Sequence, residues 1–213
     1  MLRKNRMVRT NAGSSGGRPG RSFVLRIIGG EWRGRKLRFP PVLAIRPTPD
    51  RVRETVFNWL QGVTPGSRCL DLYAGSGALG LEALSRGAQE VVFVDAEPAV
   101  VRHIAGTLHE LGCDRGHVVR ADAASYLARP ATPFDVIFLD PPFAAPVLPE
   151  ICHRVEAGGW LRGGGLAYLE APAAAGAPEL PTGWTLLRSK RAGEVGYHLA
   201  RRDSTDAPGE SHG

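Results

Sequence analysis

Cysteine is scarce in this sequence: the 213 residues include only three cysteines, Cys69, Cys113 and Cys152. An odd number excludes a fully paired disulfide framework within one chain, and their spacing matches no metal-binding motif. The sequence also lacks an apolar run of about 20 residues, the length that spans a membrane. Its basic N-terminus lacks the hydrophobic segment of a signal peptide. We therefore expect a soluble, cytoplasmic protein without a metal site or a membrane partner.

Acidic residues are nearly absent from the N-terminal part of the chain. Residues 1–53 contain fourteen lysines and arginines but only two acidic residues, Glu31 and Asp50, for a net charge of +12. The rest of the chain has thirteen basic and nineteen acidic residues, for a net charge of −6. This segregation is typical of nucleic-acid binding, in which basic side chains release counterions from phosphates. A basic tail that only aids solubility is the alternative, and it accounts better for residues 1–22 than for the segment after them.

The length fits one domain with short appendages. Residues 1–22 are rich in Arg, Gly and Ser, so we expect a disordered basic tail. We also expect residues 204–213 to form a disordered tail. Residues 23–47 predict an N-terminal extension, a β-hairpin around Gly29 and Gly30. Residues 48–203 then form the main domain.

The predicted hairpin carries basic side chains and one indole ring. Arginines on such a ribbon can bind phosphates, and an aromatic ring can stack on a base. The candidate nucleic-acid contacts are Arg26, Trp32, Arg33, Arg35, Lys36 and Arg38. The alternative is an edge hairpin that packs Trp32 on the domain.

A helix with an arginine-rich beginning follows the hairpin. Thr48 is a good N-cap, Pro49 suits the first helical position, and Asp50 meets the positive end of the helix dipole. Three further candidate nucleic-acid contacts lie at or beside its N-terminal half, namely Arg46, Arg51 and Arg53. Their alternative role is that of ordinary solvated side chains.

Apolar strand-like runs alternate with helical segments from residue 68 onward. We expect strands at 69–73, 91–95, 118–121, 134–140 and 166–170, with helices between them, and a final antiparallel pair at 184–190 and 195–201. Continuous apolar strands separated by crossover helices predict a parallel sheet covered on both faces. The fold class is therefore α/β, with a doubly wound, mostly parallel, Rossmann-like sheet and an antiparallel C-terminal hairpin.

A glycine-rich turn follows the first of these strands. Gly75, Gly77 and Gly80 have GxGxxG spacing, which allows a tight turn and a close approach of the backbone to a nucleotide ligand. Asp95 ends the next strand, where a carboxylate can bind ribose hydroxyls. This pattern alone fits NAD(P) as well as any other nucleotide.

Two further acidic residues favour S-adenosylmethionine over a dinucleotide. Asp71 directly precedes the turn, where it would repel a pyrophosphate but suit a cationic or amino-bearing ligand. Asp122 follows the third strand, where an adenine amino group could be recognised. The candidate cofactor-binding residues are Asp71, Tyr73, Ala74, Gly75, Ser76, Gly77, Gly80, Asp95, Ala96, Asp122 and Ala123.

The tetrapeptide Asp140-Pro141-Pro142-Phe143 follows the buried run that begins at Phe134. Prolines stiffen the backbone and free its carbonyls from the sheet, while the carboxylate and the ring suit a planar base with an exocyclic amino group. We therefore predict that these four residues form the catalytic site and hold a nucleobase amine. The alternative is a proline-stiffened turn with a surface carboxylate.

Four separated segments, 29–34, 46–54, 71–80 and 140–143, together resemble the RsmD family of bacterial 16S rRNA (guanine-N2) methyltransferases. The resemblance covers about residues 23–201. It implies a class I methyltransferase fold, S-adenosylmethionine as the methyl donor, and a guanine of small-subunit rRNA, naked or in an assembling 30S particle, as the substrate. We expect the enzyme to act as a monomer.

The expected chemistry is direct methyl transfer. Asp140 and the Pro141 carbonyl accept the two N2–H bonds, Asp140 takes up the proton, and Phe143 stacks on a base that has left its helix. Only the resemblance selects guanine over N6-adenine or N4-cytosine in DNA or RNA. Two other hypotheses are an NAD(P) oxidoreductase, for which no catalytic Tyr-Lys or His partner is evident, and a non-catalytic RNA-binding assembly factor.

Overall fold

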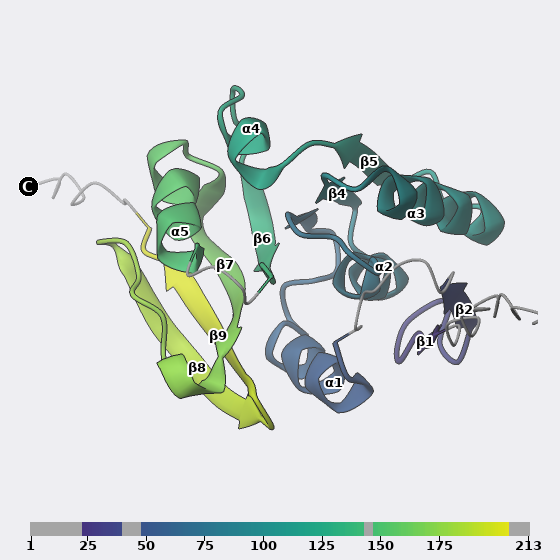
Figure 1. Ribbon diagram of the computed structural model, residues 1–213, viewed down its shortest axis with the longest axis horizontal. Coiled ribbons are helices and arrows are strands. Elements are labelled where there is room, and N and C mark those ends of the chain that lie inside the picture. The colour runs from purple at the N-terminus through teal and green to yellow at the C-terminus, as the bar shows by residue number, and fades with distance from the viewer. Residues whose placement is uncertain (1–22, 40–47, 143–146, 205–213) are drawn as a thin grey trace, which may run out of the picture.

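A seven-stranded sheet forms the centre of the computed structural model, which describes residues 23–39, 48–142 and 147–204 (Figure 1). The strands are β3 (Arg68–Asp71), β4 (Glu90–Asp95), β5 (Gly116–Arg120), β6 (Phe134–Leu139), β7 (Leu161–Pro172), β8 (Trp184–Ala192) and β9 (Val195–Arg202). Their order is β5-β4-β3-β6-β7-β9-β8. The first five strands in this order are parallel, and β9 is antiparallel to both of its neighbours. The predicted α/β sheet with an antiparallel C-terminal hairpin is confirmed.

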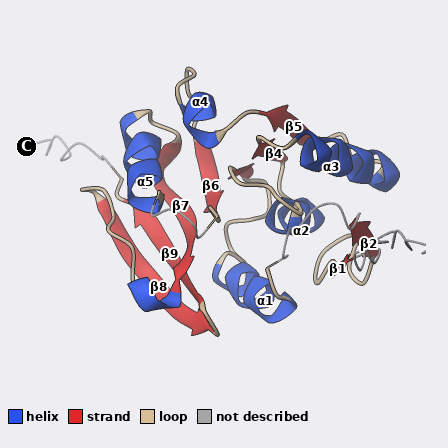
Figure 2. Ribbon diagram, in the orientation of Figure 1, coloured by secondary structure: helices blue, strands red, loops and turns tan. Residues whose placement is uncertain are grey.

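Helices cover both faces of the sheet (Figure 2). They are α1 (Asp50–Trp59), α2 (Ala78–Ser85), α3 (Pro98–Leu111), α4 (Ala123–Leu127) and α5 (Leu148–Ala157), with a short 3₁₀ turn, η1 (Ala173–Ala175), after β7. The first three pack into one apolar cluster, and α4 and α5 pack into a second. Neighbouring residues on β6 therefore face different clusters: Phe138 lies in the first and Leu139 in the second. Of the helices that the structure describes, none is long and apolar enough to cross a membrane.

The strand order changes direction between β3 and β6. From β3 the chain proceeds outward to β4 and β5, whereas from β6 it proceeds the other way to β7. In doubly wound sheets, ligands bind outside the carboxyl ends of the strands at such a switch point. Asp71 ends β3 and Asp140 directly follows β6, so both predicted acids lie at this position.

The N-terminal extension is a separate two-stranded sheet of β1 (Phe23–Arg26) and β2 (Lys36–Phe39), paired antiparallel as predicted. The prediction had the two strands joined by a turn at Gly29 and Gly30. In the structure the loop extends over residues 27–35 and packs against the end of α2. Gly30 has a φ of 76°, and a Cβ there would lie 1.8 Å from the Ser85 carbonyl oxygen. Glycine is needed here for close packing against a helix rather than for a tight hairpin turn.

The predicted N-cap of α1 is wrong. The helix begins at Asp50 after Pro49, with no capping hydrogen bond from a side chain. The Thr48 hydroxyl instead donates to Oε1 of Glu170, 3.4 Å away and 122 residues later in the sequence. A tertiary contact with a buried carboxyl group has replaced the local cap, so the start of α1 is attached to the end of β7.

Candidate active site

The glycine-rich turn joins β3 to α2 at the carboxyl edge of the sheet. Gly75 and Gly77 have φ angles of 49° and 72°, in the left-handed region that glycine adopts without strain. A Cβ on Gly80 would come within 2.2 Å of the Phe93 ring. Two of the glycines therefore turn the backbone, and the third lets α2 lie directly against β4.

Asp95 connects this turn to the start of α3. Its Oδ2 accepts a hydrogen bond from the Gly75 amide at 2.9 Å, and its Oδ1 accepts one from the Glu97 amide at 2.8 Å. Asp122 is exposed at the neighbouring strand end, where it caps α4 by accepting from the Ser125 amide at 2.9 Å. Hydrogen bonds from Ser125 hold the pKa of Asp122 below its ordinary value. Both carboxylates lie at the edge where the sequence predicted them.

The remaining predicted cofactor residues differ in exposure. Ala74, Ser76, Gly77, Gly80 and Ala123 are buried, Tyr73 and Gly75 are half-buried, and Ala96 is exposed. The exposed Ala96 and Asp122 stand beside the half-buried Asp95, so this part of the edge is accessible to a ligand.

Asp71 is a buried acid beneath the turn. Only 2% of its surface is exposed, and its Oδ2 accepts a hydrogen bond from the Gly80 amide at 3.0 Å. Burial, followed by the negative charges of Asp95 and Glu170, raises the pKa of Asp71 to about 7. Near neutral pH this carboxyl group is therefore partly protonated, and a positively charged or amino-bearing ligand would stabilise its ionised form.

Asp140 and Glu170 stand side by side on adjacent strands. Leu139 on β6 is opposite Leu169 on β7. The residues that follow them, Asp140 and Glu170, are therefore also neighbours. Burial raises the pKa of both carboxyl groups, and the charges of Glu170 and Asp71 raise that of Asp140 further. Asp140 is half-buried and Glu170 is buried, and two neighbouring carboxyl groups in such surroundings do not both ionise readily. The pair is therefore suited to holding a proton between its two carboxyl groups.

Glu170 is held in place by two hydroxyl groups. The Tyr168 hydroxyl donates to its Oε1 at 2.6 Å, and Thr48 donates to the same oxygen. The sequence interpretation missed Glu170, although the rule that selected Asp95 and Asp122, an acid at the end of an apolar parallel strand, applies to it equally.

The structure describes the predicted catalytic tetrapeptide only in part. Pro141 is buried, Pro142 is exposed, and Phe143 lies outside the described residues. Asp140 and Pro141 thus line the same strand end as Glu170, while the predicted stacking on Phe143 stays a prediction. In residues 23–39, 48–142 and 147–204, no three His, Cys, Asp or Glu side chains are grouped to hold a metal ion.

The predicted nucleic-acid contacts divide into exposed and buried residues. Those exposed to solvent are Arg26, Arg33, Arg35, Lys36, Arg38 and Arg51. Lys36 and Arg38 line a hollow of about 450 Å³ between β2 and α3, together with Arg102. Arg46 lies outside the described residues.

The prediction that Trp32 stacks on a nucleobase is wrong. Only 7% of its surface is exposed, it belongs to the apolar cluster of α1, α2 and α3, and its backbone amide donates to the Ser85 hydroxyl at 2.9 Å. The loop between β1 and β2 packs on α2 and carries the indole with it. Burial of a large apolar ring stabilises this contact, so Trp32 attaches the extension to the domain.

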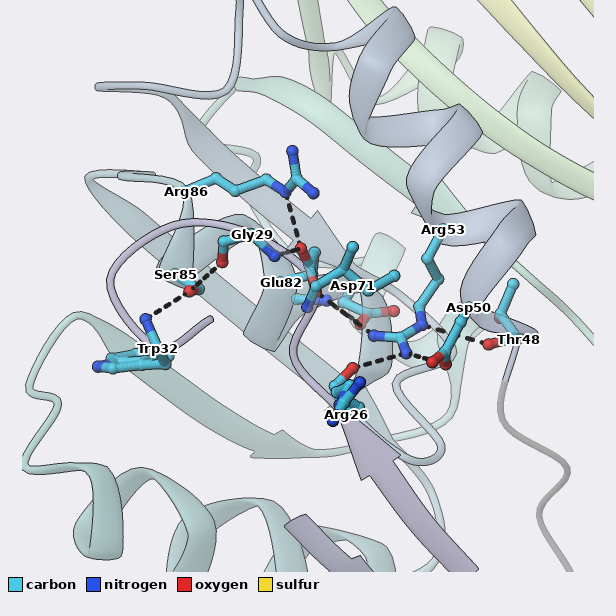
Figure 3. A network of polar contacts seen from close by, with 12 residues as sticks. Arg26, Gly29, Trp32, Thr48, Asp50, Arg53, Asp71, Glu82, Ser85 and Arg86 are labelled. Atoms are coloured by element: carbon cyan, nitrogen blue, oxygen red, sulfur yellow. Dashed lines mark hydrogen bonds and ion pairs between the residues drawn. The ribbon is translucent and has the colours of Figure 1, made fainter. Parts of the chain in front are cut away.

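The prediction that Arg53 contacts RNA is also wrong. Figure 3 shows its guanidinium group enclosed in a polar network with Glu82 and Asp50. Its Nη2 donates to Asp50 Oδ1 at 2.6 Å and to the Arg26 carbonyl at 2.8 Å, and its Nη1 lies 3.4 Å from Glu82 Oε2. Neither the Arg53 nor the Glu82 side chain is exposed. A buried carboxylate on α2 requires a counter-charge, and Arg53 provides it.

The Glu82 carboxylate also binds the N-terminal extension. Its two oxygens accept hydrogen bonds from the amides of Ile28 and Gly29, each at 2.8 Å, and Arg86 donates to Oε1 at 2.7 Å. Helix α2 begins at the glycine turn, so Glu82 connects the extension to the element that carries the candidate cofactor site (Figure 3).

The donor set fits S-adenosylmethionine. The site consists of a turn with two left-handed glycines, the buried Asp71 beneath it, and Asp95 and Asp122 at the following strand ends. It can accommodate an adenosine that carries an amino acid side chain. The fold is similar to that of two solved structures, a putative S-adenosylmethionine-dependent methyltransferase from Streptococcus mutans and a putative methyltransferase complexed with SAH, each with a TM-score of 0.63 at 16% and 17% identity. This fold and site define a class I, S-adenosylmethionine-dependent methyltransferase.

Comparison with known proteins identifies the family. The model described as Conserved hypothetical protein 95 matches residues 25–201, and the chain belongs to this family. It is 46% identical over 190 residues to ribosomal RNA small subunit methyltransferase D of Escherichia coli, covering 89% of this chain and 94% of that one. It is 40% identical to the protein of the same name from Haemophilus influenzae, covering 85% and 95%. The solved structure of the putative methyltransferase yhhF from Escherichia coli superimposes with a TM-score of 0.80 at 44% identity, covering 86% of this chain and 100% of that one.

These findings confirm the predicted RsmD family, the methyltransferase activity and the use of S-adenosylmethionine. The hypothesis of an NAD(P) oxidoreductase is set aside.

Proposed function

We propose that this enzyme methylates the exocyclic N2 of a guanine in small-subunit rRNA. The observation that carries the proposal is the pair of a half-buried Asp140 and a buried Glu170 carboxyl group at the switch point, next to the glycine turn. With Asp140 ionised, its carboxylate and the Pro141 carbonyl would offer acceptors to an amino group bound there. The relatives named ribosomal RNA small subunit methyltransferase D support rRNA as the substrate.

S-adenosylmethionine, when bound, supplies an electrophilic methyl group on its sulfonium. The residues that would hold it are the glycine turn, Asp71 on the amino acid side, Asp95 at the ribose and Asp122 at the adenine. Near Asp71 the cation of the cofactor lowers the cost of ionising this buried acid.

Asp140 and the Pro141 carbonyl bind the amino group of the base. The nitrogen lone pair of guanine N2 is delocalised into the ring, so the amine is a weak nucleophile. Two acceptors that bind its N–H groups favour a pyramidal nitrogen. The lone pair is then less delocalised into the ring, and it points in a fixed direction. Asp140 then takes the proton that the nitrogen loses, and Glu170 keeps that carboxyl group in position.

The exposed basic residues of the extension and of α1 provide the RNA contact. Lys36 and Arg38 at the hollow beside α3, and Arg51 near the start of α1, offer cations for backbone phosphates. The target base must leave its helix to reach Asp140, and Phe143, which follows Pro142 in the sequence and lies outside the described residues, would stack on it. The enzyme works in the cytoplasm as a monomer, on naked rRNA or on an assembling 30S particle.

The test is methyl transfer by the full chain to small-subunit rRNA and to assembling particles, followed by mass spectrometry of the nucleosides. We expect N2-methylguanosine. Recovery of N6-methyladenosine or N4-methylcytidine would overturn the guanine assignment, and the absence of any transfer would overturn small-subunit rRNA as the substrate.

The role of Asp140 is tested in the same assay. Asp140→Ala should reduce the rate of methyl transfer by about 10²- to 10⁴-fold, the usual contribution of a general base, while calorimetry shows unchanged affinity for S-adenosylhomocysteine. Transfer close to the wild-type rate with intact cofactor binding would show that another group takes the proton. A matched control is Asp114→Ala, which removes an exposed carboxylate from the loop between α3 and β5.

A further inference from the structure

Tyr168 and Glu170 lie two residues apart on β7, so their side chains point to the same face of the sheet. Phe138 on β6 is opposite Tyr168, and Asp140 comes two residues after Phe138. The Phe138 and Tyr168 rings belong to the apolar cluster of α1, α2 and α3. On this face the two carboxyl groups therefore lie at the carboxyl edge of the sheet, with the two rings one step further in. The sequence motifs and the proposed mechanism give Tyr168 no role.

The Tyr168 ring is fixed by its packing. None of its surface is exposed, and it meets the Phe138 ring edge-on, with 6.3 Å between the ring centroids. Phe57 of α1 packs on Phe138 in turn, at 6.0 Å. A large ring enclosed in a close-packed cluster has little freedom to move, so its hydroxyl group is held at one position.

The Tyr168 hydroxyl makes the short hydrogen bond at Glu170. It donates to Oε1 at 2.6 Å, whereas the Thr48 hydroxyl donates to the same oxygen at 3.4 Å. The first distance is typical of a strong bond to a carboxylate, and the second is longer than usual. Burial and the charge of Glu170 raise the pKa of Tyr168 well above its ordinary value, so the hydroxyl keeps its proton and stays a donor.

The two hydroxyl groups determine which oxygen of Glu170 is available to Asp140. A carboxylate oxygen accepts about two hydrogen bonds, and Oε1 already receives those of Tyr168 and Thr48. The hydrogen bond between the side chains of Asp140 and Glu170 is therefore left to Oε2. Because the terminal torsion of a glutamate side chain is broad, the carboxyl group would turn more freely without the Tyr168 hydroxyl.

Among the described residues, no other titratable group replaces Tyr168 at Glu170. The titratable groups on the neighbouring elements are Asp71 at the end of β3, Asp140 after β6, Tyr197 on β9, Lys190 on β8, and Asp50 and Arg53 on α1. Asp71 and Asp140 add negative charge rather than a fixed donor. Asp50 and Arg53 bind each other, and Lys190 is exposed on the second strand from β7.

We propose that Tyr168 is a positioning residue for methyl transfer, which orients Glu170 towards Asp140. It acts through Glu170, and its ring lies in the apolar cluster rather than at the edge that receives the base. With Oε2 of Glu170 fixed, Asp140 has one oxygen paired and directs the other to the amino group. The proposal rests on the proposed function, because that function makes Asp140 the acceptor of the base amine.

The first test is Tyr168→Phe in the full chain, which keeps the ring and removes one oxygen atom. At high pH we expect the rate at saturating rRNA to fall about five- to tenfold, the usual effect of losing a hydrogen bond. The KM for RNA and the affinity for S-adenosylhomocysteine should not change, because Tyr168 is buried. A wild-type rate, with N2-methylguanosine as the wild-type product, would refute the role of Tyr168 and leave the proposed function standing.

The pH profile of this variant separates positioning from packing. The Tyr168 hydrogen bond lowers the pKa of Glu170, so its loss raises that pKa and leaves Glu170 neutral up to a higher pH. A neutral Glu170 repels the Asp140 charge less, which lowers the pKa of Asp140. The decline of the rate on the acidic side should therefore move to lower pH. A reduced rate with an unshifted profile would overturn the proposal.

The matched control is Tyr126→Phe, which removes the hydroxyl of a buried tyrosine on α4, in the other apolar cluster. Its rate and pH profile should equal those of wild type. The decisive comparison is Glu170→Ala with Glu170→Ala/Tyr168→Phe, which should have equal rates because Tyr168 acts only through Glu170. A further five- to tenfold loss in the double variant would show that Tyr168 acts through its packing.

Carbon-13 nuclear magnetic resonance of the Glu170 carboxyl group tests the same contact without RNA. Glu170 should titrate at a higher pH in Tyr168→Phe than in wild type, because the ionised carboxylate has lost a donor. Titration at the same pH in both proteins would overturn the proposal. If wild-type enzyme makes no N2-methylguanosine, the proposed function fails, and this titration still decides whether Tyr168 controls Glu170.

Discussion

The protein buries carboxyl groups in two networks, one with arginines and one without. Glu82 faces two guanidinium groups, those of Arg53 and Arg86. Asp71, Asp140 and Glu170 make no ion pair among the described residues, and burial raises the pKa of all three. The arginines compensate the charge of Glu82. The charges of Asp71, Asp140 and Glu170 must instead be neutralised by protons or by a ligand.

This difference corresponds to different roles. The Glu82 network holds the extension, α1 and α2 together, and its charges need not change during a reaction (Figure 3). The Asp140 network lies at the switch point, where burial and neighbouring negative charge raise the pKa of its carboxyl groups and favour the uptake of a proton. One network is structural, and the other is suited to proton transfer.

The largest expected effect comes from removing the compensating charge. Arg53→Ala leaves the Glu82 carboxylate buried without its guanidinium partner on α1, so the free energy of unfolding should fall by about 3–5 kcal/mol. Urea denaturation followed by circular dichroism measures this. Arg51→Ala, an exposed neighbour on the same helix, should change stability by no more than about 0.5 kcal/mol.

A double variant tests whether the loss is electrostatic. Arg53→Met/Glu82→Gln removes both charges and keeps an acceptor for one of the two amides, of Ile28 and Gly29, that bind Glu82, so it should be more stable than Arg53→Ala. Equal stability of the two variants would show that Arg53 acts through its packing rather than its charge.

The Asp140 network predicts that a change at Glu170 alters how the rate of methyl transfer depends on pH. Asp140 must be ionised to accept N–H bonds, so the rate should decline as pH falls through its raised pKa. Glu170→Gln removes the neighbouring negative charge and lowers the pKa of Asp140, which moves this decline to lower pH. At high pH the rate should fall no more than about tenfold, or ~1.4 kcal/mol, because glutamine still accepts the Tyr168 hydrogen bond.

Single-turnover transfer measured across the acidic and neutral range checks this prediction. Glu170→Ala should reduce the rate more than Glu170→Gln at every pH, because it also removes the acceptor for Thr48 and Tyr168. A decline at the same pH in Glu170→Gln and wild type would mean that Glu170 does not act on Asp140.

The sequence predicted features that depend on neighbouring residues. The turn at Gly75 and Gly77, the acid at the end of β4 and the alternation of strands and helices all follow from short spacings and apolar runs. They appear in the structure where they were expected, because backbone conformation and strand direction alone determine them.

The errors arose where a distant partner determines the role of a residue. Arg53 pairs with Glu82, 29 residues away, and Trp32 contacts Ser85, 53 residues away. A basic or aromatic residue in a basic segment looks exposed until its partner on α2 is known. Thr48 likewise has the sequence of an N-cap, but a carboxyl group from β7 binds it.

The smallest expected effect concerns the charge that remains exposed on α1. Arg51→Ala should weaken RNA binding by less than about 1 kcal/mol and reduce the salt slope by about one, equally for different RNA sequences, as expected for a phosphate contact. Titration of rRNA fragments at several salt concentrations measures both quantities. Arg154→Ala, an exposed arginine on α5 across the sheet, should change neither. A salt slope for Arg51→Ala equal to that of Arg154→Ala would place the RNA away from α1. In that case neither Arg51, which is exposed, nor Arg53, which is buried, would bind the substrate.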